Sequence, residues 1–150
     1  MAARVIEELM KAIKQFGPDI MRTTYYERYS TPPGPAGRLQ AAAGKHKGPG
    51  DAHALGRALD IMLNATIDAE RDIANQLVDV FLLIRPRMRW DTLIYNKKIW
   101  NKAGLKFPKG GTVIEQHITH IHIDWSEKTV DEVDPDDFKP LLISMLMQVR

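Results

Sequence analysis

The sequence predicts an α+β domain, in which a small antiparallel sheet of about four strands has helices packed against it. Three observations support this fold class. Several short segments are strand-like, amphipathic helical segments lie beside them, and a chain of 150 residues that is 44% hydrophobic suits one domain with one core. We therefore treat residues 1–150 as a single domain with helical additions at residues 1–17 and 134–150.

The first part of the chain predicts a helix, a strand and a long loop. Residues 2–16 carry an apolar stripe at helical spacing, and Gly17 followed by proline ends that helix. Residues 19–29 are rich in threonine and tyrosine, which favours a strand. Residues 30–52 are rich in proline and glycine, which predicts a loop. Because this loop leads directly into His53, we expect it to form the rim of a cleft.

The central part predicts two strands separated by the main helix. Residues 56–63 form the second predicted strand. A helix follows, with Thr66 as its N-cap and a stripe of apolar residues that continues to about Arg85, where Pro86 ends it. Residues 91–95 form the next predicted strand.

The last part predicts further strands and a terminal helix. Residues 101–112 contain several glycines and lysines and are expected to be a loop, whereas residues around 113–125 are expected to be strands. The Asp134-Pro135 pair is a helix start with proline at the first position. The apolar face of that helix consists of Phe138, Leu141, Leu142, Met145, Leu146 and Val149.

Composition excludes several classes of protein. The net charge is +2 and the basic residues are scattered, so nothing indicates a nucleic-acid partner. No apolar run is long enough for membrane insertion, and charged residues interrupt residues 1–16 where a signal peptide would need an apolar core. The absence of cysteine excludes disulfides and cysteine-ligated zinc.

Four of the five histidines lie in two short segments that predict a metal site. On a strand at 56–63, Asp60 shares a face with Ala58, and His53 can turn in beside it from the preceding loop. His120 and His122 are two residues apart, so they share the other predicted strand's face. A single histidine on a strand is more often a packed or solvated residue than a ligand, but four in two clusters are harder to explain in that way.

The predicted ligand set fits one kind of metal chemistry. Two histidines and one aspartate match a tetrahedral Zn²⁺ ion whose fourth position is open to water, as in catalytic zinc sites. With His53, Asp60 and His122 as the ligands, His120 lies next to the open position and is placed to accept a proton from that water.

Two motifs resemble those of the superfamily that contains the zinc D-Ala-D-Ala peptidases, the murein endopeptidases and the hedgehog-like proteins. The HxxGxAxD motif is formed by His53, Gly56, Ala58 and Asp60, and the closing HxH motif by His120 and His122. His117 adds to the likeness with the murein endopeptidases. The segments 56–60, 94–100 and 120–122 also resemble the peptidoglycan-hydrolase-like C-terminal domains of many secreted actinobacterial proteins.

This resemblance implies roles for individual residues. It makes His53, Asp60 and His122 the zinc ligands, His120 the base and His117 an active-site neighbour. Two substrate-binding residues are also expected. Arg28 would clamp a substrate carboxylate, the alternative being a solvated arginine on a strand edge, and Trp100 would stack on a sugar or peptide, the alternative being core packing.

The resulting expectation is a zinc metallopeptidase that cleaves an amide bond in a peptidoglycan stem peptide or cross-link. Without an export signal in the sequence, such an enzyme is expected to be made in the cytoplasm and to act in the periplasm or cell wall. It would arrive there through a phage holin, through a secretion machine or as a domain excised from a longer chain. Its partner is the peptidoglycan peptide, and an immunity or carrier protein is compatible with this interpretation. The alternatives are a non-catalytic zinc-binding module and a structural domain of a phage or secretion particle.

Overall fold

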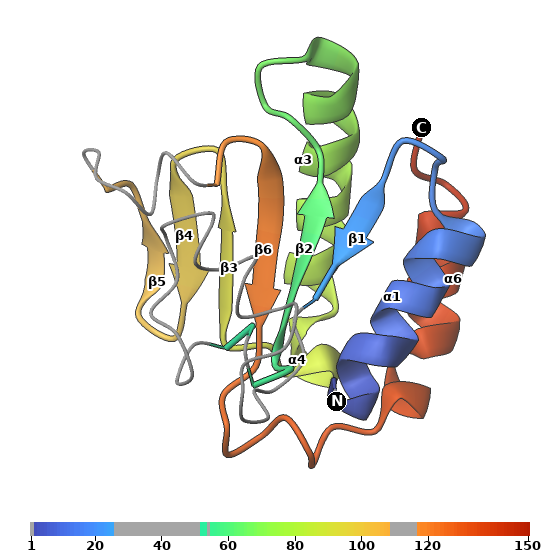
Figure 1. The fold of residues 1–150 in the computed structure, drawn as a ribbon, viewed down its shortest axis with the longest axis vertical. Coiled ribbons are helices and arrows are strands. Elements are labelled where there is room, and N and C mark those ends of the chain that lie inside the picture. The colour runs from blue at the N-terminus through green and yellow to red at the C-terminus, as the bar shows by residue number, and fades with distance from the viewer. Residues whose placement is uncertain (1, 26–51, 54, 109–116) are drawn as a thin grey trace, which may run out of the picture.

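A computed structural model describes residues 2–25, 52–53, 55–108 and 117–150, and it confirms the α+β fold class. The described residues form a six-stranded sheet with the strand order β1-β2-β6-β3-β4-β5 (Figure 1). Every pairing in the sheet is antiparallel. The strands are β1 (Arg22–Thr24), β2 (Ala58–Met62), β3 (Thr92–Tyr95), β4 (Lys98–Asn101), β5 (Gly104–Lys106) and β6 (His120–Asp124).

Helices pack behind and beside this sheet. In Figure 1, α3 lies behind the central strands, while α1 and α6 lie together beside β1, near the two termini. Side chains from all three helices join the strands in one hydrophobic core. The helical elements are α1 (Arg4–Phe16), α3 (Asp68–Leu83), α4 (Arg85–Met88), the 3-10 turn η1 (Pro135–Asp137) and α6 (Lys139–Leu146).

The predicted helices are present, with changed ends. The main helix ends at Leu83, and Pro86 then lies inside the short helix α4, where proline near the first position costs no hydrogen bond. The N-cap of α3 is Ile67, so the prediction of Thr66 was wrong. Thr66 instead donates its hydroxyl and its backbone N–H to the side chain of Asn64.

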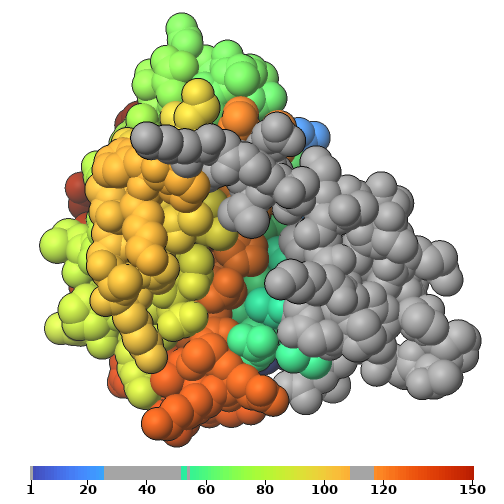
Figure 2. Space-filling view, turned by 90° about the vertical axis from the view of Figure 1, so that its left-hand side faces the viewer, coloured from blue at the N-terminus to red at the C-terminus, as the bar shows by residue number. Residues whose placement is uncertain are grey.

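The strands β4 and β5 were not predicted from the sequence. A tight turn joins β3 to β4, and its two central residues, Asn96 and Lys97, have φ values of 46° and 69°. Positive φ at both positions is the geometry of a two-residue hairpin turn, in which glycine usually follows asparagine. Beyond the hairpin, β5 pairs with β4 and forms one edge of the sheet. Figure 2 shows the molecule from this edge, with β3 and β6 behind it.

The register of the central strands divides the sheet into two faces. Leu59 pairs with Ile123, and Ile61 pairs with Ile121; all four side chains are completely buried in the core that also contains α3 residues. Because side chains alternate along a strand, Asp60 and its neighbours on β6 project from the opposite face. That face carries the residues predicted to bind metal.

No helix within the described ranges combines the length and the apolar composition that crossing a membrane requires.

Candidate metal centre

A tight turn before β2 brings His53 to the sheet. The backbone N–H of Gly56 donates to the carbonyl of His53 over 3.0 Å, and Gly56 has a φ of 70°. Glycine adopts this left-handed conformation without strain, which explains its position three residues after the histidine. The N-terminal segment secures the turn, because the N–H of Ala3 donates to the carbonyl of Gly56. His53 is completely buried as a result.

The other two predicted ligands face each other across β2 and β6. Asp60 pairs directly with His122 in the antiparallel register, so both side chains project from the same face of the sheet. The segment before β6 is held by two backbone hydrogen bonds, from Asn96 to the carbonyl of His117 and from Ala65 to that of Ile118. The pairing of β2 with β6 therefore aligns two predicted ligands that are distant in sequence.

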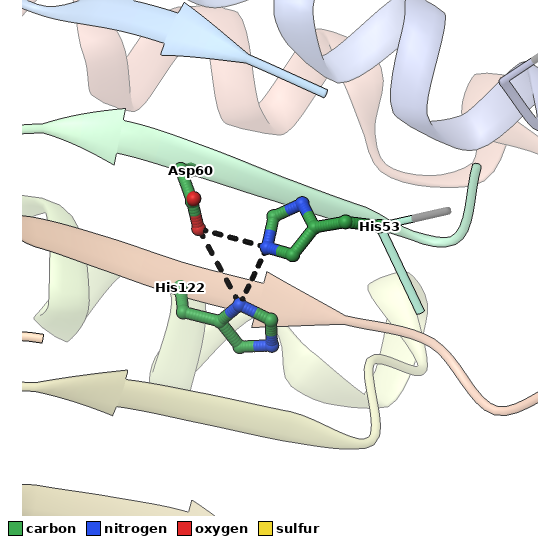
Figure 3. Close-up of side chains that lie close together, drawn as sticks. All are labelled: His53, Asp60 and His122. Atoms are coloured by element: carbon green, nitrogen blue, oxygen red, sulfur yellow. Dashed lines mark hydrogen bonds and ion pairs between the residues drawn. The ribbon is translucent and has the colours of Figure 1, made fainter. Parts of the chain in front are cut away.

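Three ligand atoms converge at one point (Figure 3). His53 Nε2 lies 3.1 Å from Asp60 Oδ1 and 3.1 Å from His122 Nδ1, and the latter two atoms are 3.4 Å apart. A tetrahedral zinc ion with bonds of about 2.0–2.2 Å holds its ligand atoms about 3.3–3.6 Å apart. One of the three separations lies within this range and two lie just below it, so these three residues could hold a metal ion.

Two further histidines lie beside the triangle of ligand atoms. His120 Nε2 lies 3.7 Å from Asp60 Oδ1, and its Nδ1 is 3.2 Å from the hydroxyl of Thr119. The ring of His117 is 4.9 Å from that of His120 and 5.2 Å from that of His122, measured between centroids. The structure therefore brings together all five of the residues that the sequence assigned to the metal and to catalysis.

At Asp60 and His122, burial and hydrogen bonding shift the pKa in opposite directions. Burial by itself raises the pKa of Asp60, but attraction to His53 and hydrogen bonds with His122 and His53 outweigh it and hold the pKa well below the ordinary 3.8. Burial by itself lowers the pKa of His122, but hydrogen bonds to Asp124 and Asp60 outweigh it and raise the pKa to about 10. Without metal, His122 therefore carries a proton on each ring nitrogen at neutral pH.

The sequence analysis missed Asp124. Its Oδ2 lies 2.7 Å from His122 Nε2, the ring nitrogen that faces away from the other two ligands. The signal was present in the sequence, since Asp124 is two residues after His122 and four after His120. Alternation along β6 places all three on one face.

Of the two predicted substrate-binding residues, the structure describes only Trp100, which does not lie with the residues predicted to bind metal. Trp100 pairs with Leu93, which pairs with Ile123, so its side chain lies on the core face of the sheet and packs against the core. This position corresponds to the core-packing alternative for Trp100. Arg28 lies outside the described residues.

The fold and the site define an α+β domain with a buried His–Asp–His group able to hold a metal ion. Residues 21–118, more than half of the chain, match the protein family described as VldE, C-terminal domain, and the chain belongs to this family. Searches among curated proteins and among solved structures gave no match. The family description states no activity, so function has to be argued from the residues.

Proposed function

We propose that this domain is a zinc-dependent peptidoglycan hydrolase that cleaves an amide bond in a stem peptide or cross-link. The observation that carries the proposal is the convergence of His53 Nε2, Asp60 Oδ1 and His122 Nδ1 to within 3.4 Å of one another, close to the ligand separations of a tetrahedral zinc site. Three protein ligands leave one position for water or substrate, which is the pattern of catalytic rather than structural zinc.

Each residue of the cluster has a part in such a reaction. Zinc held there would polarise a carbonyl group and lower the pKa of water, which is what amide hydrolysis needs at neutral pH. His120 lies beside Asp60 without belonging to the ligand triangle, so it is the residue placed to accept a proton and return it to the leaving amine. His117, packed against the rings of His120 and His122, orients them.

The substrate class rests on the resemblance of the two motifs to the zinc D-Ala-D-Ala peptidase and murein endopeptidase superfamily. The HxxGxAxD motif supplies His53 and Asp60, and the HxH motif supplies His120 and His122. Action on peptidoglycan places the protein in the periplasm or cell wall, after delivery by another route. An immunity or carrier protein would be consistent with that route.

Digestion of purified peptidoglycan tests the reaction. The zinc-loaded protein, with and without a chelator, is incubated with several wall types, and the released fragments are analysed by mass spectrometry. We expect fragments that disappear in the presence of chelator, with masses that identify the bond. Tightly bound zinc without products from any wall type would contradict hydrolysis and identify the domain as a non-catalytic zinc-binding module.

Two matched variants separate metal binding from proton transfer. His120→Ala should keep zinc and reduce turnover by about 10²–10⁴-fold, because it removes only the proton-transfer group. His53→Ala should lose both zinc and turnover, because it removes a ligand. Zinc content is measured by elemental analysis after dialysis and turnover by fragment release. Equal loss of zinc in the two variants would overturn the division of roles.

A further inference from the structure

We propose that Asp124 is a positioning residue that fixes which nitrogen of His122 binds the metal. This inference rests on the proposed metal centre and adds a fourth residue to it. Asp124 Oδ2 lies 2.7 Å from His122 Nε2, a short distance typical of a charge-assisted hydrogen bond. His122 is 7% exposed, so water offers little competition for this contact.

The two nitrogens of His122 face different partners. Nδ1 points to Asp60 and His53, at 3.4 and 3.1 Å, whereas Nε2 points to Asp124. A carboxylate accepts but does not donate, so Asp124 keeps the hydrogen on Nε2. The proton that a metal displaces is then the one on Nδ1, the nitrogen that faces the other two ligands. Histidine ligands of metals typically donate their second nitrogen to a carboxylate or carbonyl in this way.

Strand geometry makes this contact rigid. Asp124 and His122 are both residues of β6, and side chains two apart on a strand share a face. Backbone hydrogen bonds hold this end of β6 from both sides. The N–H of Asp91 donates to the carbonyl of Asp124 over 2.8 Å, and the N–H of Trp125 donates to the carbonyl of Arg57 over 3.0 Å. The aspartate is therefore held in place before any metal binds.

The charge of the site also supports a role for Asp124. Asp60 is a proposed ligand. Asp124 adds a second carboxylate, which is separated from the proposed metal position by the ring of His122. Two carboxylates neutralise a divalent cation in a site where the surrounding side chains are buried. With Asp60 alone, a bound zinc ion would leave a net positive charge there. The second carboxylate thus favours a divalent metal and makes the His122 ring a better electron donor.

Three variants test the role with Zn²⁺ as the probe. Asp124→Ala removes the acceptor, Asp124→Asn keeps an acceptor oxygen but removes the charge, and Thr92→Ala is the control. Thr92 pairs with Asp124 on the same face but makes its side-chain contact with Asp91. Zinc affinity is measured by competition with a chromogenic chelator. The nitrogen of His122 that stays protonated in the zinc-loaded protein is identified by ¹⁵N NMR of histidine-labelled protein.

We expect Asp124→Ala to weaken zinc binding about 10–100-fold. Asp124→Asn should fall between this variant and wild type, with the hydrogen still on Nε2, and Thr92→Ala should match wild type. Zinc affinity and an Nε2 signal unchanged in Asp124→Ala would overturn the inference. If that variant does not fold, a zinc affinity of Asp124→Asn equal to that of wild type would overturn it. A wild-type protein that binds no zinc would instead overturn the metal centre itself, and this inference with it.

Discussion

Asp60 is a carboxylate with only 5% of its surface exposed, and imidazole rings surround it. His53, His120 and His122 each place a nitrogen within 3.7 Å of the same oxygen, Oδ1. Burying an ionised carboxylate is costly unless it is paired, and a polar cluster of this density is unusual for a core that only stabilises a fold. The nitrogen and oxygen atoms that converge here carry lone pairs. A metal ion would bind these lone pairs, which in its absence have to be protonated or accept hydrogen bonds.

Competition between metal and protons at His122 gives the first prediction at this scale. The pKa of His122 is raised from 6.5 to about 10, so the metal-free protein keeps a proton on Nδ1 throughout the neutral range. Zinc has to displace that proton. We therefore expect zinc affinity to increase from pH 6 to pH 8 and about one proton to be released from His122 on binding.

Calorimetry in two buffers with different ionisation enthalpies measures this proton release. His122→Ala, which lacks the displaced proton and a ligand, is the matched variant and should bind zinc much more weakly. Zinc affinity that is independent of pH between 6 and 8, with no proton released, would contradict the exchange.

Single residues of the site were predictable to different degrees. Asp60 and His122 could be placed on one face because strand periodicity is a local property of the sequence, and His53 was added from its ligand chemistry and its motif. The face of Trp100 could not, because it depends on the pairing of β3 with β4. Asp124 was overlooked although periodicity places it on the histidine face, since its function depends on a contact with one particular ring nitrogen.

At the scale of elements, α1 contributes one side of the core. Leu9 lies at the centre of its buried face and is completely buried, while Lys14 on the same helix is exposed. Lys139 of α6 binds Glu8 of α1 over 2.6 Å, beside the apolar contact between the two helices. Most of the helix's stabilising effect should come from the apolar face, because partly exposed ion pairs contribute little.

Truncation of one side chain tests that view. Leu9→Ala should lower the free energy of unfolding by about 2–5 kcal/mol, since it removes a large apolar group and leaves a cavity. Lys14→Ala should change it by less than about 0.5 kcal/mol. Urea unfolding followed by circular dichroism measures both values. Similar effects of the two substitutions would show that α1 is not anchored by its buried face.

Elements with strong periodicity were predictable, and the others were not. The stripes of α1 and α3 gave correct helices with small shifts at the ends. The alternation at residues 120–124 gave β6, but that strand begins at His120, whereas strands were predicted around residues 113–125. β4 is short and only partly buried, and β5 is short and exposed, so both lack the alternation that reveals a strand. The turn between β3 and β4 was hidden because Lys97 occupies a position where glycine is usual.

At the scale of the whole molecule, a bound metal would join parts of the chain that are far apart in sequence. His53 and His122 are 69 residues apart and come from the turn before β2 and from β6. The unfolded chain does not present these ligands together, so binding to the folded state stabilises it by mass action. The size of the effect depends only on the zinc concentration relative to the dissociation constant.

Thermal unfolding measures this stabilisation. At a free zinc concentration 100 times the dissociation constant, the wild-type protein should gain about 2.7 kcal/mol, equivalent to a rise in Tm of roughly 5–11 °C for a domain of this size. Chelator should reverse the rise, and His53→Ala should show none. An equal rise in wild type and His53→Ala would mean that zinc binds elsewhere.

The direct pairing of Asp60 with His122 also restricts how the gene can change in length. If one residue were added or removed inside β2 or β6, every side chain in the rest of that strand would move to the opposite face of the sheet. The predicted ligands would then point into the core, and the isoleucines would point toward the metal. The connections between these strands carry no such parity requirement. Insertions and deletions that preserve the centre should therefore accumulate in the turns between elements, while residues 58–62, 92–95 and 120–124 keep their length.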